Sequence, residues 1–129
     1  MNIETLAYNK RQIALIEQKI SAYYQGRMFI LDLVNDLLSL VHALREVPYD
    51  WRWSIIREIN RTDCVYAVAL DHGKNFLNVH DQQMIDGYIA TIQSMLNDYK
   101  NEHKLDEFDE EYEEYKLLYP DDKHDDKKS

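Results

Sequence analysis

Glycine and proline are scarce in this chain, because its 129 residues include only three glycines and two prolines. Tight turns depend on these two residue types, so the chain can form few of them. A sandwich of many short strands needs a turn signal about every 8–12 residues. We therefore expect an all-α protein built from long helices.

Four stretches of the chain carry apolar residues at steps of three and four, as on one face of an α-helix. They span residues 3–24, 27–45, 50–72 and about 79–104. Gly26 and Gly73 follow the first and third stretches as helix exits, while Asp50 and Asn78 precede the third and fourth as caps. Four amphipathic helices with short connections favour an antiparallel four-helix bundle, with the second and most apolar helix at its centre.

The third stretch contains a polar residue where an apolar one is expected. Asp63 interrupts a stripe formed by Trp51, Ile55, Ile59, Tyr66 and Leu70. Either the helix rotates there or is partly exposed, or a partner such as an arginine holds the carboxylate near the core. The sequence leaves both interpretations open.

The segment DEFDEEYEE, residues 106–114, places seven carboxylates in nine positions. The larger residues around it are spaced three, four, three and four apart: Leu105, Phe108, Tyr112, Tyr115 and Tyr119. This spacing predicts a fifth, acidic helix over about 105–119, ended by Pro120, whose aromatic face can fold back on the bundle. We expect residues 1–119 to form one domain and residues 120–129 to be a disordered tail.

The negative charge is concentrated at the C-terminus. The net charge is −9; residues 105–129 hold 11 acids and 4 lysines, or −7, whereas residues 1–104 hold 13 acids and 11 bases, or −2. An acidic protein repels nucleic acid and anionic membranes and attracts basic partners. We expect a protein partner, with no direct nucleic-acid or membrane contact. The start, MNIETLAYNK, lacks the pattern of a signal peptide, which favours the cytoplasm.

Motifs that indicate catalysis are missing. None of His42, His72, His80 and His103 has the glutamate three residues earlier that a di-iron bundle needs. Zinc-protease spacing, cysteine pairs and glycine-rich phosphate loops are also absent, and the lone Cys64 cannot form an internal disulfide. We predict that the protein is not an enzyme and uses no metal or cofactor.

The region from about Ile16 to Met95 resembles a family of small helical immunity proteins, which bacteria encode beside polymorphic toxins and contact-dependent growth inhibition systems. The resemblance is carried by IEQKISAYYQGRMFILDLVNDLLSLVHAL, by Trp51, by Asp63 and by VYAVALDHG at 65–73. Thr62 departs from the apolar residue of the pattern. The resemblance implies a stoichiometric inhibitor that binds a cognate toxin domain, often a nuclease with a basic cleft.

Such a resemblance does not locate the interface, so we select contact residues by their chemistry. Carboxylates of the acidic segment can face a basic nuclease, and exposed Tyr or Trp side chains are common at the centre of interfaces. The candidates are Tyr49, Trp53, Asp106, Glu107, Asp109, Glu110, Glu111, Glu113 and Glu114. Packing under the start of the third helix is the alternative role for Trp53. Arg27, Asp32 and Asp36 are weaker candidates.

Two other functions compete with the immunity protein. One is an acidic nucleic-acid mimic that inhibits a host nucleic-acid-binding protein, although a mimic should spread its charge over its whole length. The other is a structural module that dimerises through the aromatic stripe at 108–119. Nothing in the sequence indicates a homo-oligomer directly.

Overall fold

A computed structural model describes residues 2–73 and 77–119, and within them the regular structure is entirely helical. The elements are α1 (Ile3–Tyr24), α2 (Ile30–Ala43), α3 (Tyr49–Asp71), α4 (Val79–Glu102), the short 3-10 turn η1 (Leu105–Glu107) and α5 (Glu110–Leu118). The all-α prediction is therefore confirmed. The expected tail, residues 120–129, lies outside the described part of the chain.

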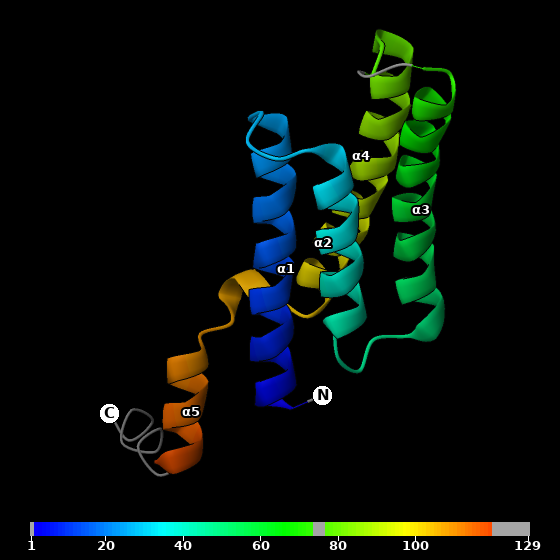
Figure 1. Ribbon diagram of the computed structural model, residues 1–129. Helices are drawn as coiled ribbons and strands as arrows, with labels where there is room; N and C mark the ends of the chain where they lie inside the picture. The colour runs from blue at the N-terminus through cyan, green and yellow to red at the C-terminus, as the bar shows by residue number, and fades with distance from the viewer. Residues whose placement is uncertain (1, 74–76, 120–129) are drawn as a thin grey trace.

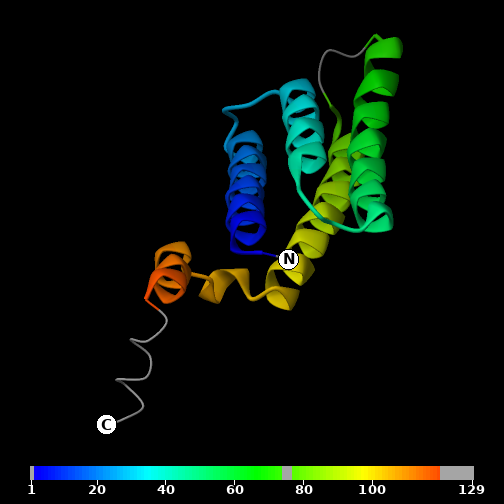
Figure 2. The same cartoon turned by 90° about the horizontal axis from the view of Figure 1, so that it is seen from below.

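The first four helices run alternately up and down, and together they form a helical bundle (Figure 1). The most apolar helix, α2, lies between α1 and α3 and contacts both, while α4 packs on α3 and also contacts α1. Figure 2 shows α5 standing at one side, next to α1 and away from α3 and α4. The C-terminal segment is thus attached to one edge of the bundle.

The helix ends follow the expected signals, with two differences. Gly26 and Gly73 adopt left-handed conformations after α1 and α3, and Asn78 forms a reciprocal capping box with Asp81. The second helix begins at Ile30 rather than near residue 27, because the left-handed turn at Gly26 is followed by non-helical residues. Asp50 is not the cap of α3. It lies in the first turn, where its negative charge interacts favourably with the positive end of the helix dipole.

The apolar stripes of all four long helices meet in a single hydrophobic cluster. Its members are nearly inaccessible to solvent. They include Ile13, Ile16 and Ile20 from α1, Leu33 and Leu37 from α2, Ile55 and Ile59 from α3, and Ile85, Ile89, Ile92 and Leu96 from α4. Burial of this surface supplies the main drive for folding.

The buried line of α3 passes through Thr62 rather than through Asp63. Thr62 is buried, and its hydroxyl donates to the backbone carbonyl of Glu58 at 3.0 Å, so its polar atom is satisfied. Asp63 is partly exposed, which agrees with the interpretation that the helix rotates or is partly exposed at this point. Leu70, expected in the stripe, is exposed, and Ala69 is buried in its place. The interruption at Asp63 therefore reflects a small rotation of the buried face.

Two polar side chains hold the connection between α2 and α3. Asn9, which is 0% exposed, accepts from the backbone N–H of Arg45 at 2.9 Å and donates to its carbonyl at 2.8 Å. From the other side, the guanidinium of Arg52 donates to the carbonyls of Val41, His42 and Leu44 at 2.7–2.8 Å. Val41 and His42 lie in the last turn of α2 and Leu44 is its C-cap, where carbonyls lack the usual helical N–H donors; the Val41 carbonyl also accepts from the Leu44 N–H at 3.3 Å. The α2 end of this connection is thereby tied to both α1 and α3.

Trp51→Ala should lower the free energy of unfolding by about 2–3 kcal/mol. The indole is partly buried against the core, with its ring centroid 5.2 Å from that of Tyr99. Urea denaturation of the two proteins measures the difference. Trp53→Ala is the matched control, because Trp53 is exposed and should contribute less than about 1 kcal/mol. Equal losses for the two variants would contradict the assignment of Trp51 to the core.

Candidate partner-binding surface

The C-terminal segment is broken into two short pieces, so the prediction of one continuous helix over 105–119 is wrong. Lys104 adopts a left-handed conformation (φ 54) after α4, and the chain then makes the η1 turn. Phe108 is extended, and Asp109 starts α5 by accepting the backbone N–H of Tyr112 at 3.2 Å. The three- and four-residue spacing around this break is therefore not the period of a single helix face.

Two residues attach this segment to the bundle. Leu105 is 0% exposed and belongs to the hydrophobic core. The carbonyl of Phe108 accepts from the Lys10 ammonium of α1 at 2.7 Å, and the same ammonium lies 5.9 Å from the centroid of the Phe108 ring. Beyond Phe108 the segment continues as α5, which also contacts α1. The start of the acidic segment is thus part of the folded domain.

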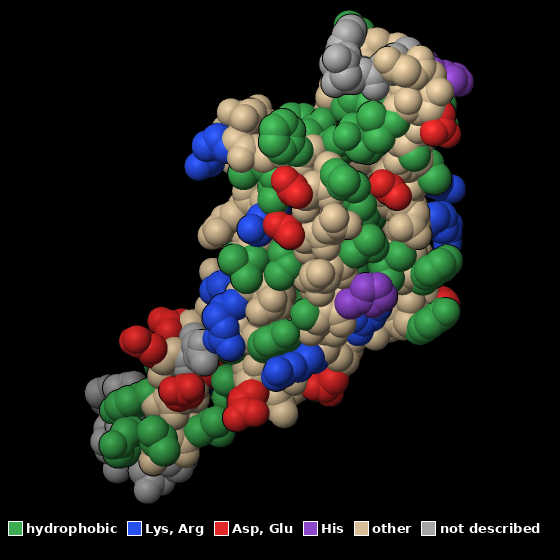
Figure 3. Space-filling model, viewed as in Figure 1, with side chains coloured by type: hydrophobic (Ala, Val, Ile, Leu, Met, Phe, Trp, Pro, Cys, Tyr) green, Lys and Arg blue, Asp and Glu red, His purple; other side chains and the backbone are tan. Residues whose placement is uncertain are grey.

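Most candidate carboxylates lie on the surface of this segment. Asp106, Glu107, Asp109, Glu111 and Glu114 are exposed, and Glu110 is the first residue of α5. Glu113 is partly buried and forms an ion pair with Lys116, with its oxygen 3.2 Å from the lysine nitrogen. In Figure 3 acidic and hydrophobic side chains mix over α5, at the lower left. The structure gathers these seven candidates at one end of the molecule.

The aromatic side chains of α5 and of its C-cap Tyr119 are not buried, so the expected folding back of an aromatic face is not observed. Tyr112, Tyr115 and Tyr119 are 57%, 47% and 55% exposed. The rings of Tyr115 and Tyr119 are tilted by 42° with centroids 5.0 Å apart, and the Lys116 ammonium lies 5.0 Å from the centroid of the Tyr112 ring. Leu117 and Leu118 are also exposed. This helix therefore presents tyrosines and leucines to solvent beside its carboxylates.

Tyr49 and Trp53 lie one turn apart at the start of α3, and both are exposed. Figure 1 places that end of α3 across α2 and α1 from α5. The two aromatic candidates and the carboxylates therefore do not form one contiguous patch, and a single partner would have to reach around the end of the bundle to contact both. Among the weaker candidates, Arg27 and Asp32 are exposed, and Asp36 pairs with Lys19 at 3.2 Å.

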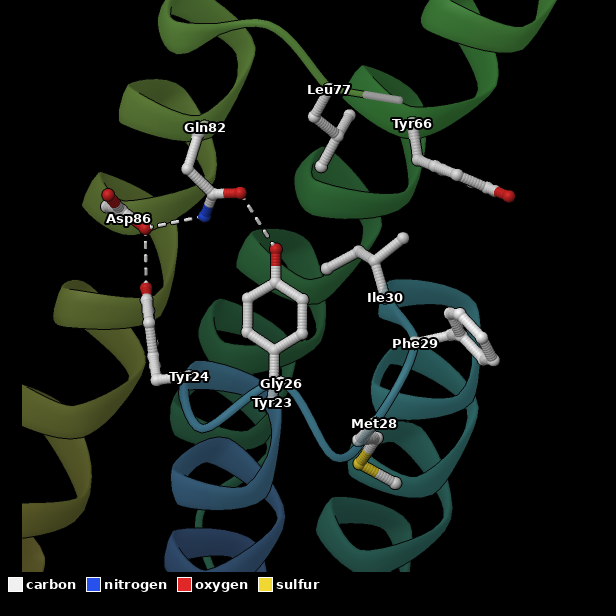
Figure 4. Close-up of a pocket in the computed structure, with 10 residues that line it drawn as sticks. All are labelled: Tyr23, Tyr24, Gly26, Met28, Phe29, Ile30, Tyr66, Leu77, Gln82 and Asp86. Atoms are coloured by element: carbon white, nitrogen blue, oxygen red, sulfur yellow. Dashed lines mark hydrogen bonds between the residues drawn. The ribbon is translucent and has the colours of Figure 1, made fainter. Parts of the chain in front are cut away.

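A cavity of about 660 Å³ opens between the α1–α2 turn and the first half of α4, where the sequence suggested no site. Figure 4 shows its lining: Tyr23, Tyr24, Gly26, Met28, Phe29, Ile30, Tyr66, Leu77, Gln82 and Asp86. Burial, reinforced by the neighbouring Asp86 carboxylate, raises the pKa of the Tyr24 hydroxyl, which stays protonated as a donor. In the sequence, only the adjacent Tyr23 and Tyr24 at the end of α1 hint at this cavity. Two tyrosines at a helix end are common without any binding site, so they do not predict one.

Comparisons of the chain with protein-family models, with curated proteins and with solved structures find no match. Within residues 2–73 and 77–119, no three His, Cys, Asp or Glu side chains come together in a way that could hold a metal ion. None of the helices described there combines the length and hydrophobicity needed to cross a bilayer.

Proposed function

We propose that this protein is an immunity protein, which binds a cognate bacterial toxin domain stoichiometrically and neutralises it without catalysing a reaction. In this proposal α1–α4 form an antiparallel four-helix bundle that supports the binding segment, and the protein acts in the cytoplasm. The toxin domain is a basic nuclease acting on RNA. The resemblance of residues 16–95 to helical immunity proteins suggests the class, and the C-terminal segment supports the binding mode.

The observation that carries the proposal is the exposure of the α5 tyrosines next to carboxylates. A segment that served solubility alone would need its charges but not exposed tyrosine and leucine side chains. Tyrosines are enriched at protein interfaces, where they provide a large contact area with little loss of conformational entropy. The surface around Tyr112, Tyr115 and Tyr119 therefore has the composition of a binding site rather than that of a solvated tail.

The charge of this segment supports a basic partner. Residues 105–119 contain seven acidic residues and one lysine, or −6. A nuclease must be electropositive to hold its substrate, and complementary charge can raise association rates to about 10⁸–10⁹ M⁻¹s⁻¹ at low salt. The exposed carboxylates then take the place of substrate phosphates, either in the active site or beside it.

The same charge argues against the two competing functions. Pairing α5 with its own copy would bring two segments of −6 together, which costs electrostatic energy at low salt. A nucleic-acid mimic would extend its charge over the bundle, whereas residues 1–104 carry only −2. A basic partner protein can both neutralise the negative charge of residues 105–119 and cover their exposed tyrosine and leucine side chains.

Growth of cells that express the polypeptide encoded immediately upstream of this gene tests the proposal. We expect that polypeptide to stop growth with an empty vector, and co-expression of this chain to restore growth and to yield a co-purifying complex. Toxicity that persists at a normal level of this chain would contradict the proposal. An upstream polypeptide that is harmless by itself would also contradict it.

A further inference from the structure

The cavity at the α1–α2 turn contains one carboxylate held in a fixed position. Oδ1 of Asp86 accepts from the hydroxyl of Tyr24 at 2.7 Å and from Nε2 of Gln82 at 2.8 Å. Gln82 is oriented in turn by the hydroxyl of Tyr23, which donates to its Oε1 at 3.0 Å. Figure 4 shows this network along one side of the cavity. The hydrogen bonds restrain the Asp86 side chain, so its position is set before any ligand arrives.

The second oxygen of this carboxylate is available. Within the described residues, Oδ2 of Asp86 accepts no hydrogen bond and makes no ion pair, and no lysine or arginine lines the cavity. A carboxylate with one free oxygen and no nearby cation can bind a positively charged donor. Among the residues that the structure describes, the Asp86 carboxylate therefore has hydrogen-bond donors but no cationic partner in the cavity.

The opposite side of the cavity is apolar and aromatic. Phe29 is 81% exposed at the rim, and in Figure 4 it lies with Ile30 across the Tyr23 ring from Asp86. Leu77 adds a further apolar wall. An exposed phenylalanine beside a cavity offers a contact surface that the fold itself does not use. Any occupant should therefore carry an apolar part as well as a cation.

We propose that this cavity receives an arginine side chain from a loop of a partner protein. The guanidinium would donate to the Asp86 carboxylate at its edge of the cavity, and the methylene stem would extend past the ring of Tyr23 toward Ile30. Arginine fits this site better than lysine because its planar, weakly hydrated guanidinium binds carboxylates and also stacks on aromatic rings. The volume of about 660 Å³ leaves room for neighbouring residues of the same loop. This inference rests on the proposed function only in taking the partner to be basic.

The test uses a peptide rather than the toxin, so that its outcome is independent of the proposed function. The probe is acetyl-Leu-Arg-Leu-amide, titrated into the full-length protein while amide shifts are followed by NMR. We expect saturable shifts at Tyr24, Gln82 and Asp86. A peptide with citrulline in place of arginine has the same shape without the charge, and it should bind at least about fivefold more weakly.

Two protein variants complete the experiment. Asp86→Asn should weaken the arginine peptide by about fivefold or more, while its amide oxygen can still accept from Tyr24 and preserve the network. Asp98→Asn removes the same charge from an exposed position of α4 and should leave binding unchanged. Equal binding of the citrulline peptide, equal weakening by both variants, or shifts confined to α5 would each overturn the inference.

Discussion

Replacing Glu107, Glu111 and Glu114 with glutamine is expected to weaken the complex with the toxin domain by about tenfold to a hundredfold at low salt. Each exposed pair between opposite charges contributes up to about 1 kcal/mol, and their combined field speeds association. The dependence of affinity on salt should flatten as well, because fewer charges remain to be screened. Titration of the partner at several salt concentrations measures both effects.

A second triple variant controls for net charge. Asp71, Asp98 and Glu102 are exposed on α3 and α4, and replacing them with the corresponding amides removes the same number of negative charges. This variant should bind almost as tightly as the wild type. If both triple variants lose affinity equally, only the overall charge matters. If neither does, the acidic segment is not part of the interface.

Substitution is a better test of this segment than truncation after Lys104. Such a truncation would remove Leu105, which is fully buried in the core. Loss of a buried leucine destabilises a protein by about 2–5 kcal/mol, so a binding defect would then be confused with a folding defect. Amide substitutions leave Leu105 and the contact of Phe108 with α1 in place.

Asn9→Ala should lower the free energy of unfolding by about 3 kcal/mol. The buried amide of Asn9 satisfies the backbone N–H and carbonyl of Arg45 and also donates to the Tyr99 hydroxyl at 3.0 Å. Alanine would remove the side chain that pairs with the Arg45 N–H and carbonyl, and with it the link between α1 and the α2–α3 connection. Chemical denaturation measures the loss.

Asn60→Ala is the control for this substitution. Asn60 is exposed in the middle of α3, where alanine is a good helix former, so stability should change by less than about 0.5 kcal/mol. If Asn9→Ala lowers the free energy of unfolding by less than about 1 kcal/mol, water replaces the missing amide, and the hydrogen bonds of Asn9 to Arg45 are not needed for stability.

The helices could be predicted from the sequence because apolar residues recur every three or four positions along the face of each helix that is buried. The stripe from Ile85 to Tyr99 in α4 is the clearest case, since its residues at the expected steps are the ones buried. Asn9 could not be assigned in the same way. A buried amide that binds backbone groups 36 residues away leaves no local pattern, because its partners are main-chain atoms of any residue type.

The candidate surface was harder to predict than the fold. The spacing of Phe108, Tyr112 and Tyr115 is that of a core-facing helix, yet Lys104 adopts a left-handed turn without being glycine or asparagine, and the helix is interrupted. Tyr112, Tyr115 and Tyr119 remain exposed even though α5 contacts α1. The periodicity of a sequence shows which face of a helix is buried but not which helices lie next to each other. The separation of Trp53 from the carboxylates could therefore not be predicted from the sequence.

Titration of the purified polypeptide encoded immediately upstream into the full-length protein, at low and at high salt, tests the central claim most directly. We expect a one-to-one complex whose affinity falls at least about tenfold at high salt, and loss of the toxic activity as the complex saturates. Absence of a complex at low salt would contradict the account. So would a complex whose affinity does not depend on salt.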